Sequence, residues 1–96
     1  MTMSADLVEK TERYERMLSS ALDIVKMAPQ ESSSLSASAD ECMEMVRAYL
    51  SDGQNFHKKG DYVNALAAFS YGYGWLDSGV RFGLFAVPEG TGLFTI

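Results

Sequence analysis

The sequence predicts an all-α fold, namely an antiparallel bundle of three helices followed by an extended C-terminal tail. Apolar residues recur at alternating three- and four-residue spacings in three segments, and no segment alternates strictly between apolar and polar residues as a half-buried strand does. Serine, proline and glycine residues, which interrupt helices, separate the segments. We therefore expect one domain over residues 1–96, with helices at about 4–28, 38–59 and 61–84 and a tail at 85–96.

The first helix is predicted from one continuous stripe of apolar or small residues. Ser4 is the expected N-cap, and the helix is expected to end at Ala28, because Pro29 disfavours helical geometry at the residue before it. Glu9 and Arg13 lie one turn apart on the opposite face, with the acidic residue first, which favours an ion pair. The stripe consists of Leu7, Thr11, Tyr14, Leu18, Ala21, Val25 and Ala28.

The second helix is expected to begin at Ser38, because Ser38 and Glu41 fit the capping-box pattern that satisfies free backbone amides. Residues 29–37 before it are rich in serine and lack periodicity, so they are interpreted as a surface connection. Gly60 is expected to close the helix, since glycine readily adopts the left-handed conformation that follows many helices. The apolar stripe consists of Cys42, Met45, Val46, Tyr49, Leu50, Gly53 and Phe56.

The third helix is expected to start directly after Asp61, its predicted N-cap, so that the second and third helices form a tight αα-hairpin. The tail that follows it contains Pro88, two glycines and several apolar residues, and we expect it to pack on another surface in extended form. The main apolar stripe of the third helix consists of Tyr62, Ala65, Leu66, Phe69, Tyr73, Leu76, Val80 and Leu84.

The side of the third helix opposite this stripe is apolar as well, although a surface helix normally carries polar residues there. Tyr71, Trp75 and Phe82 follow one another on this side, and the only charged residues between 62 and 84 are Asp77 and Arg81. Three explanations are open. The helix is the middle of the bundle and buries both sides, a protein partner covers the row, or a small ligand lies against it.

Four glycines within this predicted helix strengthen the same point. Gly72, Gly74, Gly79 and Gly83 each cost about 1 kcal/mol relative to alanine inside a helix. We therefore expect a close approach of backbone or an aromatic ring that compensates for this cost.

Few residues are arranged for catalysis or for metal binding. His57 and Cys42 are the only histidine and the only cysteine, and fifteen residues on one helix separate them by about 22 Å, so they cannot form a dyad. Cys42 is interpreted as a small buried hydrophobe, and His57 as a residue at the edge of the second helix, with a proton-transfer or ligand role as the alternative. We expect no catalytic residue, no metal ion and no cofactor.

The formal net charge of −5 and the pI of about 4.6 indicate which partners the chain avoids. Nucleic acids and anionic membranes bind basic surfaces, so neither is expected as a partner.

The single cysteine, Cys42, cannot form an intrachain disulfide, and the N-terminal residues lack the order of a signal peptide. A cytoplasmic location is therefore expected.

The third helix carries a pattern that is similar to a known family. The pattern is Gly-Asp-Tyr at 60–62, Ser-Tyr-x-x-Gly-Trp-Leu-Asp at 70–77 and Gly-x-x-x-Gly-Leu at 79–84. It resembles the small archaeal helical family known as domain of unknown function three-five-seven, and the resemblance covers most of residues 1–85. The resemblance implies a compact bundle of three helices, an archaeal cytoplasmic source and no established activity. Some members are attached to nucleotidyltransferase-like domains, which implies an accessory module.

The function expected from these observations is that of a non-enzymatic interaction module. It would self-associate as a homodimer, or dock on a larger protein, through the third helix and the tail. The competing hypothesis is a small-ligand-binding or catalytic accessory domain, associated with a nucleotidyltransferase-like enzyme. The candidate interface or ligand residues of the two hypotheses are Ala68, Tyr71, Trp75, Gly79, Phe82, Asp77, Arg81 and His57.

Overall fold

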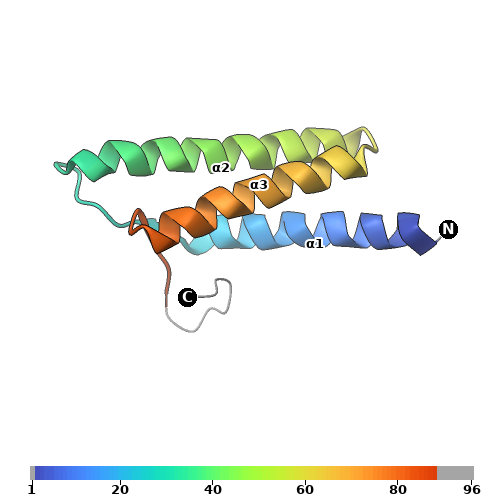
Figure 1. Cartoon of the computed structure of the whole chain (residues 1–96), viewed down its shortest axis with the longest axis horizontal. Helices are drawn as coiled ribbons and strands as arrows, with labels where there is room; N and C mark the ends of the chain where they lie inside the picture. Colours follow the sequence, from blue (N-terminus) through green and yellow to red (C-terminus); the bar gives the residue numbers. More distant parts are fainter. Residues whose placement is uncertain (1, 89–96) are drawn as a thin grey trace.

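The computed structural model describes residues 2–88 and contains an antiparallel bundle of three helices (Figure 1). Helix α1 spans Thr2–Ile24, α2 spans Ser34–Lys58 and α3 spans Tyr62–Arg81. Two short strands, β1 (Lys26–Met27) and β2 (Phe85–Ala86), form an antiparallel pair. The predicted all-α bundle is confirmed, and the small strand pair is a feature that the periodicity of the sequence did not predict.

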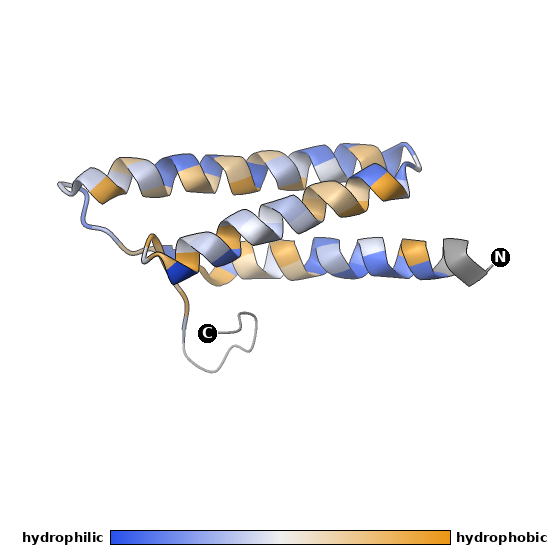
Figure 2. Ribbon diagram, in the orientation of Figure 1, coloured by the Kyte–Doolittle hydropathy of each residue, from blue (hydrophilic) through white to orange (hydrophobic). Residues whose placement is uncertain are grey.

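Helix α3 lies obliquely across α1 and α2, which run antiparallel to each other (Figure 1). It packs most extensively on α2 and less on α1, whereas α1 and α2 touch each other little. Hydrophobic residues recur along all three helices, and α3 is the most hydrophobic of them (Figure 2). The buried core consists of Leu18, Ala21, Ala39, Cys42, Val46, Ala65, Phe69, Leu76 and Phe85.

Two buried glycines let aromatic rings enter the core. A Cβ atom at Gly53 of α2 would overlap the ring of Phe69, which comes from α3. A Cβ atom at Gly79 of α3 would overlap the ring of Phe85, which comes from β2. Because both rings are buried, these glycines set how closely the surrounding elements pack.

The expectation that glycines of α3 mark close approaches is therefore confirmed at Gly79, and also at Gly72. A Cβ atom at Gly72 would lie 2.9 Å from a methyl carbon of Leu18 in α1. Gly74 is exposed and has no such neighbour within 4 Å, so the expectation is wrong there. Gly83 lies beyond the end of the helix and has a φ of +80°, a left-handed backbone conformation that glycine adopts readily.

The first helix ends four residues earlier than expected, at Ile24. After Val25, the backbone leaves the helical hydrogen-bond pattern, and the amide of Ala28 donates to the carbonyl of Leu84 at 3.0 Å. Pairing with the segment after α3 thus replaces the last helical turn, a long-range effect that the position of Pro29 could not indicate. At the other end, the helix includes Thr2, so the expectation that Ser4 is its N-cap is wrong.

The second helix starts at Ser34, four residues before the expected position, and its N-cap is Ser33. The Ser33 hydroxyl accepts a hydrogen bond from the amide of Leu35 at 3.1 Å. Ser38 lies inside the helix with its side chain exposed, so its predicted role as the cap is wrong. Several serines precede the helix, and any of them can cap a free amide, so the local pattern did not select the correct one.

Replacing Ser33 with alanine should lower the free energy of unfolding by about 1 kcal/mol, because the first turn of α2 loses its capping hydroxyl. Ser38→Ala is the matched control, since alanine is the better helix former at an exposed interior position and should raise stability by up to about 0.5 kcal/mol. Urea denaturation followed by circular dichroism measures both. Equal midpoints for Ser33→Ala and the parent chain would contradict this position of the cap.

The connection between α2 and α3 follows the prediction. Gly60 has a φ of +78° and follows the last turn of α2. The Asp61 carboxylate caps α3 by accepting from the amide of Asn64 at 3.2 Å and from its side-chain amide at 2.7 Å. The expected αα-hairpin is therefore closed by the two residues that the sequence singled out.

The third helix ends at Arg81, three residues before the expected end, and Gly83 turns the chain back toward α1. The side chain of Phe85 then enters the core, so the predicted tail is anchored at its first residue. Residues 89–96 of that tail lie outside the described part of the structure. Within residues 2–88, each helix is too short or too polar to cross a membrane.

Candidate functional site

Three aromatic side chains form an exposed row along α3 and its C-cap residue. We call this row the aromatic surface and define it as Tyr71, Trp75 and Phe82. Their exposed fractions are 64%, 43% and 78%. The opposite side of α3 supplies Phe69 and Leu76 to the core, so α1 and α2 cover only one side of the helix. The hypothesis that the aromatic row is buried within the bundle is therefore wrong.

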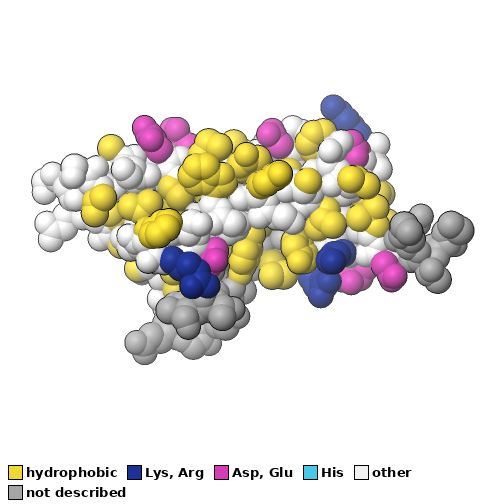
Figure 3. All heavy atoms as spheres, in the orientation of Figure 1, with side chains coloured by type: hydrophobic (Ala, Val, Ile, Leu, Met, Phe, Trp, Pro, Cys, Tyr) yellow, Lys and Arg dark blue, Asp and Glu magenta, His cyan; other side chains and the backbone are white. Residues whose placement is uncertain are grey.

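The aromatic surface continues from α3 onto α2. The rings of Tyr71 and Tyr49 lie 5.7 Å apart between centroids, so the tyrosine of α3 rests beside one of α2. Met45 of α2 is also exposed. Figure 3 shows hydrophobic side chains gathered over α2 and α3 on this face, with acidic side chains along the outer edge of α2.

A groove of about 640 Å³ runs between α2 and α3, beside Trp75 and Phe82. Small residues on the facing sides of the two helices leave this space open, because Ser78 and Gly79 of α3 line it opposite Cys42 of α2. The remaining lining combines two apolar side chains with three polar ones, and the charged residues among those that line the groove are both carboxylates. These further residues are Met45, Leu84, Ser38, Glu41 and Glu44.

Two of the candidate interface residues lie deeper than the aromatic surface. Ala68 is buried in the contact of α3 with its neighbours, so its placement on an exposed interface is wrong. Gly79 is also buried, under the ring of Phe85, but it lines the groove through its backbone. Sequence projection placed Ala68 on the side of α3 opposite the core stripe, because it could not show which positions neighbouring elements cover.

Asp77 and Arg81 form an ion pair across one turn of α3, with 3.1 Å between Arg81 Nε and Asp77 Oδ2. Neither residue lines the groove. Burial of the phenol, and then the negative charge of Asp77, raise the pKa of Tyr73. The pair thus lies beside the aromatic surface without forming part of it.

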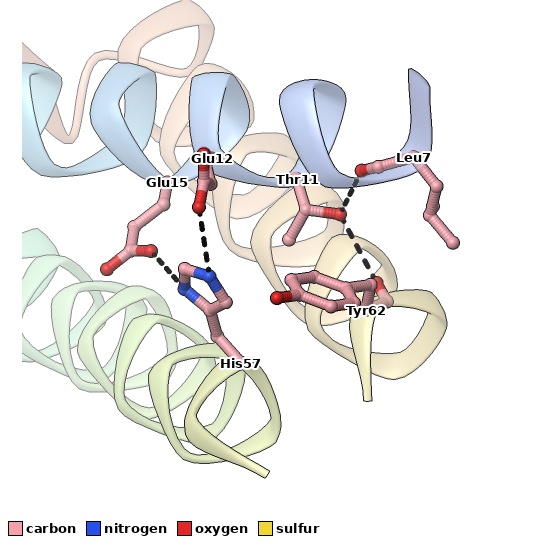
Figure 4. A network of polar contacts seen from close by, with 6 residues as sticks. All are labelled: Leu7, Thr11, Glu12, Glu15, His57 and Tyr62. Atoms are coloured by element: carbon pink, nitrogen blue, oxygen red, sulfur yellow. Dashed lines mark hydrogen bonds and ion pairs between the residues drawn. The ribbon is translucent and has the colours of Figure 1, made fainter. Parts of the chain in front are cut away.

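His57 lies in the last turn of α2 and connects this helix to α1 (Figure 4). Its Nδ1 atom is 3.0 Å from Glu15 Oε1, and its Nε2 atom is 3.4 Å from Glu12 Oε2. Its ring also lies 5.3 Å from that of Tyr62, between centroids. Because both ring nitrogens face carboxylates of α1, His57 forms a polar link between the two helices. The sequence did not indicate these two glutamates, since they lie more than forty residues before His57.

A buried threonine supports the same end of the bundle. Thr11 is fully buried, and its hydroxyl lies 2.7 Å from the carbonyl of Leu7 and 3.4 Å from that of Tyr62 (Figure 4). The contact with Tyr62 joins α1 to the start of α3.

Within the described residues, no three His, Cys, Asp or Glu side chains are grouped so that they could hold a metal ion.

Cys42 should react slowly with iodoacetamide in the native chain. Burial raises the pKa of its thiol, and the thiolate is the form that reacts. At pH 8 we expect alkylation at least about tenfold slower than in urea, where the thiol is exposed. Mass spectrometry of timed samples measures the rate, and an equal rate in both conditions would contradict the burial of Cys42.

A family model described as protein of unknown function (DUF357) matches residues 13–85. The chain belongs to the DUF357 family. This is the family that the pattern on α3 resembles, so that prediction is confirmed. A comparison with curated proteins found no match.

A solved DUF357 structure has the same fold. The crystal structure of protein AF1782 from Archaeoglobus fulgidus matches with a TM-score of 0.73 and 20% sequence identity. The match covers 90% of this chain and 99% of that chain. The fold of this DUF357 chain is thus found in a protein whose sequence differs at most positions.

The residues that indicated the DUF357 family have different roles in this chain. Gly60 and Asp61 form the turn between α2 and α3, and Gly79 admits the ring of Phe85 into the core. Trp75, in contrast, is 43% exposed and borders the groove. The family pattern therefore contains structural residues and at least one residue that is available for contact with another molecule.

Proposed function

We propose that this domain is a non-enzymatic protein-interaction module that binds its partner through the aromatic surface and the adjacent groove. The observation that carries this proposal is the exposure of Tyr71, Trp75 and Phe82 on one side of α3. Monomeric proteins rarely leave large apolar side chains together on the surface. Aromatic residues, and tryptophan and tyrosine above all, are the usual anchors of protein interfaces.

Docking on another protein is favoured over self-association by the charge around the groove. The lining includes Glu41 and Glu44 and no basic residue. In a twofold dimer built on this surface, each copy would present the same acidic edge, and the chain as a whole carries a net charge of −5. Repulsion between like charges opposes such a contact.

A peptide-display selection tests this function, because it requires no identified partner. The full chain is the target, and peptides are selected from a random library. We expect the selected peptides to bind Trp75→Ala with a Kd raised about thirtyfold, while circular dichroism of the variant stays near that of the parent. Val63→Ala is the matched control, because Val63 is also exposed on α3 but lies outside the groove, and its Kd should stay within about twofold.

Two results would overturn the proposal. One is the selection of peptides whose affinity is unchanged by Trp75→Ala. The other is the unfolding of Trp75→Ala, since that would mean that the tryptophan serves the core of the bundle.

A small-ligand site is the second candidate function, and the size of the groove supports it. The volume of about 640 Å³ lies within the range typical of ligand pockets. The residues expected to bind such a ligand all lie outside the lining of the groove, namely Tyr71, Asp77, Arg81 and His57. A thermal-shift screen with nucleotides and metabolites tests it, and a shift that is lost in Trp75→Ala would favour a ligand over a protein partner.

A further inference from the structure

The groove between α2 and α3 has an apolar floor, and the charged side chains along its edge are all acidic. Met45, Trp75 and Phe82 are all exposed and line it. Glu41 and Glu44 line the α2 side, and no basic side chain takes part in the lining. An apolar groove between two helices is a common docking place for the apolar face of an amphipathic helix.

The two carboxylates of this edge lack a partner within the described residues. Glu41 and Glu44 are three positions apart on α2, where like charges repel each other. Arg47 follows Glu44 by one turn, yet no ion pair forms between Arg47 or any other described basic side chain and either glutamate. A cation placed at this edge would relieve the repulsion. Because the edge borders the apolar floor, one partner segment could contact both.

We propose that the groove binds a basic amphipathic helix of a partner protein. Its apolar side chains would cover Trp75, Phe82 and Met45, and its lysine or arginine side chains would lie beside Glu41 and Glu44. A helix bound in this way would extend the three-helix bundle to four helices. This inference rests on the proposed function and adds the chemistry of the partner segment.

A pair of designed peptides tests the charge of the partner. Both peptides are helical and have leucines on one face, and the other face carries lysine in the first and glutamate in the second. Trp75 is the only tryptophan of the chain, so its emission reports binding at the groove directly. We expect the leucine–lysine peptide to shift the emission to shorter wavelength, and the leucine–glutamate peptide to leave it unchanged.

Charge variants of the protein separate a specific edge from general attraction to an acidic chain. Glu41→Lys/Glu44→Lys should raise the Kd of the labelled leucine–lysine peptide, followed by anisotropy, at least about tenfold. The matched control, Glu31→Lys/Asp52→Lys, changes the net charge by the same amount at exposed positions outside the groove. It should change the Kd by less than about threefold. Equal weakening by the two variants would overturn the proposal.

A scrambled leucine–lysine peptide, in which the leucines surround the helix, tests the amphipathic requirement. We expect it to bind at least about tenfold more weakly than the ordered peptide, and equal affinity would overturn the proposal. Sedimentation velocity shows whether a second copy occupies the groove instead. A concentration-dependent dimer that the leucine–lysine peptide dissociates would mean that a second copy is the natural occupant, and this would also overturn the proposal.

The peptide-display selection distinguishes this inference from the proposed function. Selected peptides that depend on Trp75 and are rich in lysine or arginine would support both. Selected peptides that depend on Trp75 but are neutral or acidic would overturn the basic helix and leave the interaction module standing.

Discussion

Replacing Phe69 with alanine is expected to lower the free energy of unfolding by about 4 kcal/mol, which is near the upper end of what a single core substitution costs. The Phe69 ring is fully buried in the core, and it comes from α3 to lie against Gly53 of α2. Its removal deletes the apolar contact area and leaves a cavity between the two helices that pack most extensively. Urea denaturation followed by circular dichroism measures the change.

Phe82→Ala is the matched control for this prediction. Phe82 is the same residue type at the end of the same helix, but its side chain is 78% exposed. We expect its replacement to change stability by no more than about 0.5 kcal/mol. Similar losses for the two variants would contradict the division of α3 into a core side and an exposed side.

Replacing Gly53 with alanine is expected to lower the free energy of unfolding by about 2 to 3 kcal/mol, although alanine is the better helix former. The added Cβ atom would overlap the ring of Phe69, which is fully buried, so the ring or the helix must shift. Gly74→Ala is the matched control, because a Cβ atom there meets nothing within 4 Å. It should raise stability by up to about 1 kcal/mol.

A double-mutant cycle isolates the cause of the Gly53 effect. In the Phe69→Ala background the ring is absent, so Gly53→Ala should cost less than about 0.5 kcal/mol. An unchanged cost in that background would place the origin of the effect in the backbone of α2 rather than in its contact with Phe69.

The helices could be predicted from sequence because their signals are local. The periodic stripe of α3 and the cap at Asp61 involve residues within a few positions of one another, and both agree with the structure. The predicted start of α2 was wrong because Ser33 and Ser38 carry the same capping hydroxyl. The local pattern does not show which of the two serines caps the helix. The end of α1 depends on pairing with a segment that follows α3, which no local signal contains.

The candidate site was predictable in composition but not in shape. The excess of aromatic residues on α3 pointed to Tyr71, Trp75 and Phe82, whereas their exposure depends on which side of α3 the other helices cover. The groove exists only where α2 and α3 face each other, so the edge formed by Glu41 and Glu44 could not be connected with Trp75 in advance. The contact between His57 and Glu15 could not be predicted for the same reason, because it joins residues of different helices.

The strand pair β1–β2 has a consequence for the order in which the chain folds. Met27 pairs with Phe85, 58 positions along the chain, and the loop that this pairing closes contains all of α2 and α3. The α2–α3 hairpin needs only a short turn to bring its helices together, so its contacts carry a small entropic cost of closure. We therefore expect this hairpin to be the early folding unit, with α1 and the strand pair added late as contacts of high sequence separation.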